Sequence, residues 1–352
     1  MASIPQLDEI TADWLADVVG APRGLRLRAT SVGAGQVARC LKLELLDGDV
    51  VIVSVVAKGP SADPTSRSTA AAQRLYLRET SFYRDLASRI GTPTPTCYWV
   101  DRNDEDDFLI ILEDMSPMAD VDQFDGLSSV QAQVGLTALA ELHAPTRGDL
   151  TLHGADWLGG TASALAPLYQ AVLPGLFSAF LERYDDVLSQ NVRDVVTRLG
   201  QRLGDFSGYS SPYACVVHGD FRTDNLLFGA RGGTVPLAVV DWQTVSVSSP
   251  LLDVAYFITT SLDDEMCARL DATLLEYYMA EMERLGAPLE SESAHREFAR
   301  YTLQPVVMLV SAAVIVERTE RGDRMFLEMI RRAVIAVERW GAFEELDRHA
   351  AA

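Results

Sequence analysis

The chain has 352 residues, with 30 basic and 50 acidic side chains, so its formal net charge is −20. Such a field repels nucleic acid and anionic membranes, and we expect neither as a partner. The same charge is compatible with a cationic small substrate. The length exceeds what one compact core usually holds, which predicts two lobes.

Three features bear on the compartment. The start, MASIPQLDEITADWLADVVG, has early acids and lacks the basic and apolar pattern of a signal peptide. The longest apolar stretch, PVVMLVSAAVIV at 305–316, is too short to span a bilayer and predicts a buried helix. Four scattered cysteines without a C-x-x-C pair are typical of buried thiols in a reducing compartment. We therefore expect a cytoplasmic protein, whose oligomeric state the sequence leaves open.

The first third of the chain is predicted to be rich in strands. Residues 7–19 predict a short amphipathic helix, and residues 27–57 predict three antiparallel strands joined by hairpins. A helix is expected over 61–91, and a β-hairpin over 95–115. The acidic run DRNDEDD in that hairpin is either a solvated tip or a metal cluster, and the solvated tip is favoured.

The rest of the chain is predicted to be mainly helical. Helical patterns cover 128–144, 161–202 and the region from 249 to the end. Between them lie three short apolar strands, ACVV, NLLF and PLAVV. The sequence thus predicts an α+β protein with a small β-rich lobe at 1–115 and a larger helical lobe at 116–352.

Oxygen-bearing side chains gather around those short strands. The segment HGDFRTDN places Asp220 and Asn225 in a loop, and Asp241 follows the strand PLAVV. Carboxylate and amide oxygens suit Mg²⁺, which takes phosphate oxygens at its remaining positions. Phosphoryl transfer requires such a metal and an oriented nucleophile. Asp220 is therefore the candidate catalytic residue, and Asn225 and Asp241 are the candidate metal ligands.

HGDFRTDN followed by VVDWQ resembles the aminoglycoside phosphotransferase and choline kinase-like family, which shares the protein-kinase-like fold. Gly219 stands where protein kinases have the Arg of H-R-D, and Asp241-Trp242-Gln243 replaces D-F-G. Both departures are typical of small-molecule kinases. The C-terminal RGDRMFLEMIRRAVIAVERW and the phrase E-x-x-F-Y favour the ecdysteroid kinase-like branch. The resemblance implies an antiparallel-sheet N-lobe that binds nucleotide and a mainly helical C-lobe with the catalytic loop and the acceptor site.

The resemblance also implies nucleotide-binding residues. Lys58 ends the third strand and is one of only two lysines, against 28 arginines. Its compact ammonium would reach the α- and β-phosphates, whereas Lys42 is expected to be an exposed strand residue. Glu79 either holds Lys58 in an ion pair or is a surface helix residue. Gly33 and Gly35 either cover the phosphates or form a plain hairpin turn.

Further roles follow from the resemblance alone. Glu113 and Met115 would offer backbone groups to adenine. His143 and His218 would brace neighbouring segments by packing and hydrogen bonds. Asp253 is either an ordinary polar residue at a helix start or an anchor for the backbone of the catalytic loop.

The sequence therefore predicts a kinase that uses ATP and Mg²⁺ and moves the γ-phosphoryl group to a hydroxyl of a small molecule. Aminoglycosides, amino sugars, choline-like alcohols and hydroxylated lipids or steroids all stay open as acceptors, as does the choice between ATP and GTP. The alternative is a catalytically silent kinase-like protein that binds nucleotide or ligand. A protein kinase is disfavoured because the A-P-E element has no counterpart.

Overall fold

The computed structural model describes residues 4–32, 37–103, 107–158, 162–316 and 318–350. The chain forms two compact units, which are described separately. Unit 1 comprises Met1–Arg89, Pro93–Met118 and Gly229–Thr244, and unit 2 comprises Ile90–Thr92, Ala119–Phe228 and Val245–Ala352. The main difference from the expected lobes is that the segment 229–244 belongs to unit 1, while Ile90–Thr92 belongs to unit 2 and unit 1 extends to Met118.

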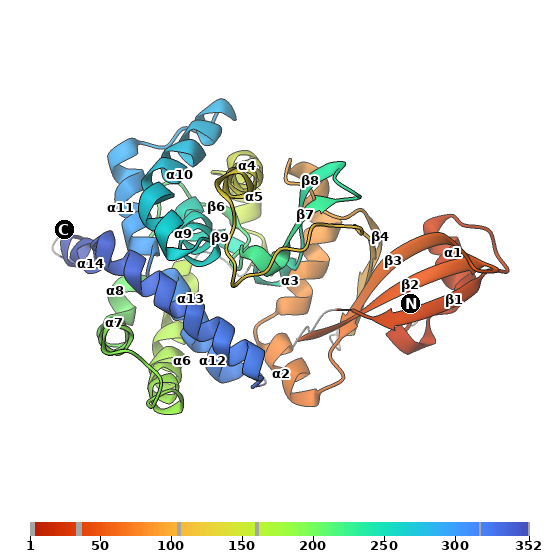
Figure 1. The fold of residues 1–352 in the computed structure, drawn as a ribbon, viewed down its shortest axis with the longest axis horizontal. Helices are drawn as coiled ribbons and strands as arrows, with labels where there is room; N and C mark the ends of the chain where they lie inside the picture. The colour runs from red at the N-terminus through yellow and green to blue at the C-terminus, as the bar shows by residue number, and fades with distance from the viewer. Residues whose placement is uncertain (1–3, 33–36, 104–106, 159–161, 317, 351–352) are drawn as a thin grey trace. The chain divides into compact units, whose positions relative to one another are not determined.

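Unit 1 is built on a five-stranded antiparallel sheet (Figure 1). Its strands lie in the order β1 (Arg26–Ser31), β2 (Ala38–Asp47), β3 (Val50–Pro60), β5 (Phe108–Glu113) and β4 (Cys97–Arg102). Gly48 has a φ of 58° in the tight turn between β2 and β3, which is the left-handed region that such hairpins require. The three expected strands and the expected hairpin are both part of this sheet.

The N-terminal helix packs against one face of the sheet. Helix α1 (Ala12–Val19) follows a 3-10 turn (Leu7–Glu9) and begins at Thr11, whose hydroxyl accepts a hydrogen bond from the Trp14 amide. Leu15 of α1 is fully buried against apolar side chains of β2, β3 and β5. These alternate side chains form the core of unit 1 because successive residues of a strand point to opposite faces.

The single helix expected over 61–91 is wrong. The chain instead forms α2 (Pro64–Ala72) and α3 (Leu75–Ser81), followed by a π-helical turn (Phe82–Leu86) and a 3-10 turn (Ala87–Arg89). Arg74, between the two helices, has a φ of 58° and breaks the hydrogen-bond ladder. The halves differ in packing, since α2 buries only Ala70 whereas α3 buries most of its length. The Tyr76 hydroxyl fixes α3 by donating to the Val37 carbonyl at 2.6 Å.

Unit 2 is mainly helical. Its helices are α4 (Ser129–Thr146), α5 (Leu150–His153), α6 (Ala162–Arg183), α7 (Gln190–Gly200), α8 (Leu203–Ser207), α9 (Pro250–Ser261), α10 (Asp264–Arg284), α11 (Ser291–Tyr301), α12 (Gln304–Ile315), α13 (Glu320–Arg339) and α14 (Ala342–Ala350). A two-stranded antiparallel sheet joins β6 (Cys215–Val217) and β9 (Ser246–Ser248). The chain passes from unit 2 to unit 1 within β7 (Leu226–Ala230), which pairs with β8 (Val235–Val239).

The main core of unit 2 lies where α12 packs against α6 and α13. The apolar stretch at 305–316 provides α12, as the sequence predicts, and Val306 and Val310 are fully buried in this core. Among the described residues, the helical span Ser291–Ile315 is long and apolar enough to cross a membrane, and an 18-residue window within it has a mean hydropathy of 1.5. The span is divided between α11 and α12, and 67% of that window is buried inside the protein, as in the core helix of a globular domain.

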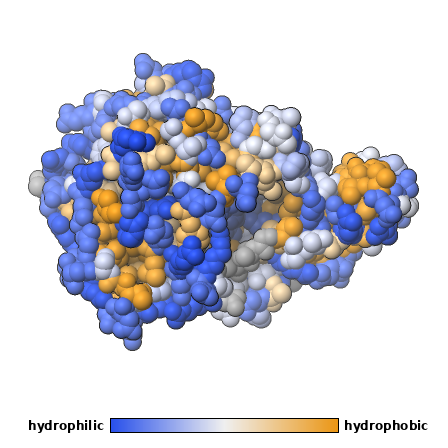
Figure 2. Space-filling view, in the orientation of Figure 1, coloured by the Kyte–Doolittle hydropathy of each residue, from blue (hydrophilic) through white to orange (hydrophobic). Residues whose placement is uncertain are grey.

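One surface of unit 1 is apolar. Val50, Val51 and Ile52 at the start of β3 are exposed. Figure 2 shows hydrophobic residues gathered at the end of unit 1 where the ribbon of Figure 1 carries α1. Most of the visible surface of unit 2 is hydrophilic, in keeping with the net charge (Figure 2).

Candidate functional site

Lys58 lies in unit 1 between two carboxylates. It is near the end of β3, opposite Cys40 on β2 and Ile110 on β5. Its Nζ is 2.7 Å from Oε1 of Glu79 on α3 and 2.8 Å from Oδ1 of Asp241. Lys58 is 8% exposed and Glu79 is 1% exposed. The ion pair between Lys58 and Glu79 that the family resemblance implies is thus present, and Asp241 joins it.

Burial and charge act against each other in this cluster. Burial alone would lower the pKa of Lys58, but the charges of Asp241 and Glu79 raise that pKa well above its ordinary value. For Glu79, burial raises the pKa, and the attraction of Lys58 offsets only part of the rise. The ammonium therefore stays charged, and it pairs with one buried carboxylate, Glu79, and one partly exposed carboxylate, Asp241.

The turn that carries Asp241 is held by an aromatic stack. Asp241 has a φ of 66°, a left-handed backbone that costs about 1–2 kcal/mol for a residue with a side chain. The next residue, Trp242, is fully buried and stacks on Phe82, with ring centroids 3.8 Å apart and planes 8° apart. Gln243 donates to Oδ2 of Asp241 at 3.2 Å. The surrounding contacts thus fix a carboxylate whose local backbone is unfavourable.

The segment expected to meet adenine is already hydrogen-bonded within unit 1. The Glu113 amide donates to the Thr96 carbonyl at 2.8 Å, and the Met115 carbonyl accepts from the Arg231 amide at 2.8 Å. The Glu113 carboxylate forms an ion pair with Arg231. A nucleotide base at this segment would need main-chain groups other than these two, and the roles of Glu113 and Met115 stay predictions.

Lys42 takes part in a second network that the sequence interpretation missed. Its Nζ is 2.7 Å from Oδ2 of Asp114, and its side chain is 30% exposed. Asp114 also accepts from the Ser54 hydroxyl at 2.6 Å and from the Ser116 amide at 3.0 Å. Lys42 is therefore an ion-paired and partly buried residue rather than an exposed one. Its register opposite Val56 on β3 gives no signal of this partner.

In unit 2, helix α9 holds the backbone of the loop that follows β6. The Asp253 carboxylate accepts the amide of His218 at 2.6 Å and that of Gly219 at 2.8 Å. The start of α9 is capped by Ser249, so the first of the two readings of Asp253 does not apply. Gly219 has a φ of 85°, which explains a glycine where protein kinases have an arginine.

Two histidines brace the same region, as expected. His143 on α4 is fully buried, with its Nε2 3.2 Å from Asp253 Oδ2 and its Nδ1 2.8 Å from the Tyr278 hydroxyl. His218 Nδ1 accepts the Asp220 amide at 3.2 Å. His143 therefore supports the loop through Asp253, and His218 supports it through the Asp220 amide.

The Asp220 carboxylate is held through both of its oxygens. The Tyr256 hydroxyl on α9 donates to Oδ1 at 3.0 Å, and the Asn225 Nδ2 donates to Oδ2 at 3.0 Å. Asn225 also donates to the Asp220 carbonyl at 2.8 Å, so its amide nitrogen faces Asp220 and its amide oxygen faces the other way. The Asp220 side chain remains 20% exposed, which leaves it accessible to a small hydroxyl compound.

The sequence interpretation missed Tyr256, and Arg222 is a second side chain that contacts Asp220. Arg222 Nε is 3.3 Å from Asp220 Oδ1, and its Nη1 is 2.6 Å from Asp224 Oδ2. Burial would lower the pKa of Arg222, but the charge of Asp220 raises it above its ordinary value. Tyr256 follows Asp253 by three residues on a helix, so both lie on one face. That spacing is the signal that would have found it.

The predicted residues therefore form two groups. Lys58, Glu79 and Asp241 lie together in unit 1, and Asp220 and Asn225 lie together in unit 2. Gly33 and Gly35 lie outside the described residues. Across the described part of the chain, no three or more His, Cys, Asp or Glu side chains form a metal-binding group. A magnesium ion here would need the Asn225 amide, water and phosphate oxygens as well.

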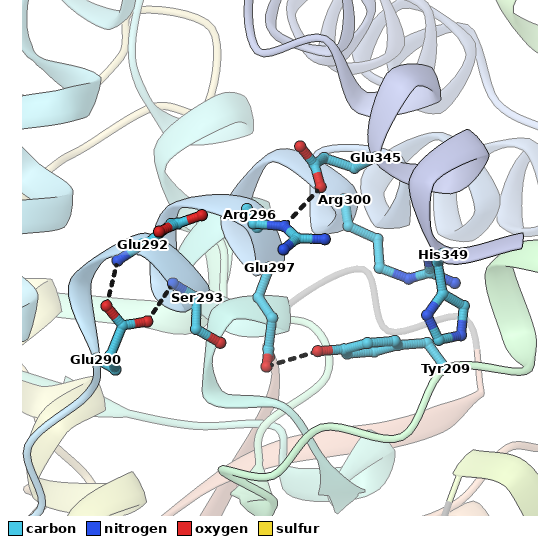
Figure 3. A pocket seen from close by; sticks show the side chains of 9 residues that line it. All are labelled: Tyr209, Glu290, Glu292, Ser293, Arg296, Glu297, Arg300, Glu345 and His349. Carbon is cyan, nitrogen blue, oxygen red and sulfur yellow. Dashed lines mark hydrogen bonds and ion pairs between the residues drawn. The ribbon is translucent and has the colours of Figure 1, made fainter. Parts of the chain in front are cut away.

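A polar cavity lies in unit 2 apart from these groups (Figure 3). It has a volume of about 220 Å³ and is lined by Tyr209, Glu290, Glu292, Ser293, Arg296, Glu297, Arg300, Glu345 and His349. Glu297, 2% exposed, accepts hydrogen bonds from the hydroxyls of Tyr209, Ser211 and Ser249. Glu290 caps the start of α11 and Glu345 forms an ion pair with Arg296, as Figure 3 shows.

Sequence comparison matches part of the chain to known proteins. A model of the ecdysteroid kinase-like family matches residues 157–290, which include the Asp220 loop and α9 but not Glu79 or the C-terminal run. A stretch of 41 residues is 51% identical to acyl-CoA dehydrogenase family member 10 of Mus musculus. That stretch is 12% of this chain and only 4% of the mouse protein.

Structural comparison covers nearly the whole chain. A thermostable mutant of aminoglycoside phosphotransferase APH(4)-Ia matches with a TM-score of 0.54 at 14% identity, over 94% of this chain and 99% of that one. The GDP complex of aminoglycoside 2'-phosphotransferase-IIIa gives 0.53 at 15%, over 89% and 94%. An ethanolamine kinase of Plasmodium vivax gives 0.51 at 10%, over 87% and 82%.

At sequence identities of 10–15%, these structural matches establish the fold and not the activity. The five-stranded antiparallel sheet followed by a mainly helical unit is the arrangement expected from the sequence. The chain has the protein-kinase-like fold of small-molecule phosphotransferases, and its resemblance to the ecdysteroid kinase-like family is confirmed.

Proposed function

We propose that the protein transfers the γ-phosphoryl group of ATP to a hydroxyl of a small molecule. The observation that carries the proposal is the buried Lys58, which is gripped by Glu79 and Asp241 in a chain that otherwise uses arginine for all but one of its cationic side chains. Moving charged groups out of water has a desolvation cost, so a buried cation paired with carboxylates is weak evidence for a stabilising role and is compatible with a functional one. A compact ammonium held in this way suits the α- and β-phosphates of a nucleotide.

The donor set suits Mg²⁺. The Asn225 amide nitrogen is committed to Asp220, so the amide oxygen is the atom that it offers to a hard cation. Asp241 offers a carboxylate whose backbone is fixed by the Trp242 stack. When bound, the metal would neutralise charge on the phosphates. Asn225 in unit 2 and Asp241 in unit 1 are each candidate ligands for it.

Asp220 would orient the acceptor and take its proton. The acceptor oxygen forms a bond to the γ-phosphorus, the bond from that phosphorus to the bridging oxygen of ADP breaks, and the hydroxyl proton passes to the Asp220 carboxylate. Tyr256 and Asn225 hold that carboxylate in a single orientation before the substrate arrives. The acceptor is a small alcohol, and the net charge of −20 favours one that carries an amine.

The test is an acceptor screen with the purified protein, ATP and Mg²⁺, in which ADP release and phosphorylated product are both measured. In the Asp220→Asn variant we expect kcat to fall by about 10²–10⁴-fold, because the proton acceptor is lost, while nucleotide binding is retained. Asp194→Asn, which changes an exposed carboxylate on α7, is the matched control and should leave kcat unaltered.

Two outcomes would contradict the proposal. Unaltered turnover in Asp220→Asn would remove that residue from its role. Nucleotide binding by the wild-type protein without transfer to any alcohol in the screen would support the catalytically silent alternative.

A further inference from the structure

Helix α9 makes hydrogen bonds to the Asp220 loop from two residues, and only one of these residues holds the backbone. Asp253 accepts the amides of His218 and Gly219, which fixes the path of the chain. Tyr256, one helical turn further on, reaches the carboxylate of Asp220 itself, at 3.0 Å from Oδ1. The second contact is not needed to shape the loop, because the backbone is already held.

The Tyr256 ring and the Tyr256 hydroxyl have separate tasks. The ring belongs to the main hydrophobic core of unit 2, and the residue is 2% exposed. A phenylalanine would fill the same space. The hydroxyl, by contrast, extends from this core to a carboxylate that is 20% exposed. The hydroxyl at the end of this buried side chain therefore contacts Asp220, the proposed proton acceptor of the transfer.

The hydroxyl is also a constant donor. Burial, together with the charge of Asp220, raises the pKa of Tyr256 well above its ordinary value. The phenol therefore stays protonated at neutral pH, and it can donate to Oδ1 there. Because Asn225 occupies Oδ2 at 3.0 Å, the carboxylate cannot rotate without breaking one of the two hydrogen bonds.

We propose that Tyr256 is a positioning residue for the transfer reaction, whose hydroxyl orients the Asp220 carboxylate toward the acceptor hydroxyl. This inference rests on the proposed function. Its specific content is that removal of one oxygen atom from a buried core residue lowers kcat and leaves substrate binding unaltered.

The test compares two tyrosines of the same core. Tyr256→Phe removes the contact to Asp220. Tyr184→Phe removes a hydrogen bond of the same kind, since the Tyr184 hydroxyl donates to Asp323 Oδ1 at 2.6 Å and the residue is 3% exposed in the same core. We expect kcat to fall about tenfold or more in Tyr256→Phe, as for the loss of one hydrogen bond to a charged group. We expect the KM values for both substrates to stay constant, and Tyr184→Phe to keep the wild-type kcat.

Two results would overturn the inference while the wild-type protein is active. One is a wild-type kcat in Tyr256→Phe. The other is an equal fall in Tyr184→Phe, which would mean that loosening of the core, and not the contact with Asp220, lowers the rate.

A readout independent of activity separates this inference from the proposed function. Thermal unfolding is measured for Tyr256→Phe, Asp220→Asn and the double variant. If the two side chains interact, the double variant loses less Tm than the sum of the single losses. Additive losses would refute the contact itself, whether or not any acceptor is found. Coupling without transfer to any alcohol would refute the proposed function and, with it, the catalytic meaning of the contact.

Discussion

The two units bury carboxylates in opposite ways. In unit 1, Glu79 and Asp241 share one cation, Lys58. In unit 2, Asp253 is held by the amides of His218 and Gly219 and by the ring of His143. One cation bridges the first pair, whereas several weaker donors share the second task. The ion-pair contacts of Glu79 and Asp241 therefore meet at one residue, and the support of the Asp220 loop is distributed.

The strongest way to break this comparison is Lys58→Met, which removes the cation that the buried Glu79 shares with the partly exposed Asp241. We expect the free energy of unfolding to fall by about 3–5 kcal/mol, together with loss of nucleotide binding. The fall should shrink as the pH is lowered, because the carboxylates can then become neutral. Urea unfolding at two pH values measures both effects. A loss smaller than that of Lys42→Met would contradict the dependence on one cation.

Asp253→Asn tests the distributed side of the comparison. The amide oxygen still accepts one backbone amide, but the charge and one acceptor position are lost. We expect a destabilisation of about 2 kcal/mol, the range for hydrogen bonds to a charged group. The measurement is urea unfolding, with hydrogen exchange at the His218 and Gly219 amides as a local readout. Faster exchange at these amides is expected, and unaltered exchange would mean that Asp253 does not hold them.

Lys42→Met should change the free energy of unfolding least, and it is the matched control for Lys58→Met because these are the only two lysines. A partly exposed ion pair contributes about 1 kcal/mol or less. Burial would raise the pKa of Asp114, but Lys42, Ser54 and Ser116 together lower it below its ordinary value.

The sign of the pH dependence follows from that lowered pKa. The contribution of Asp114 to stability is present above its unfolded pKa of about 4, and it is lost as the pH falls below that value. Lys42→Met should therefore flatten the acid side of a plot of Tm against pH. An unaltered acid side would mean that the two serine contacts alone account for the low pKa of Asp114.

Local patterns were sufficient to predict much of this molecule. Alternation and turn residues predicted the sheet strands, and the family resemblance implied the ion pair between Lys58 and Glu79 that the structure contains. The phrase HGDFRTDN located the loop in which Asn225 meets Asp220. These features depend on neighbours in sequence or on a motif of fixed spacing, and a single sequence carries that information.

Contacts between distant segments could not be predicted. The alternation of residues along β3 does not indicate that Asp241, 183 positions later, shares Lys58 with Glu79. The break at Arg74 was missed because the apolar pattern continues through it, while the packing of Tyr76 decides where α3 begins. Tyr256 was missed because its ring fits an ordinary core pattern and its hydroxyl does not show in that pattern.

The scarcity of lysine has a practical consequence for chemical labelling. Beyond the α-amino group, amine-directed acylation can modify only Lys42, at 30% side-chain exposure, and Lys58, at 10%. The reagent reaches the Lys58 amine only when its ion pairs with Glu79 and Asp241 break. The rate at which Lys58 is acylated, read by mass spectrometry against Lys42 in the same molecule, would thus report local opening of the sheet end that holds it.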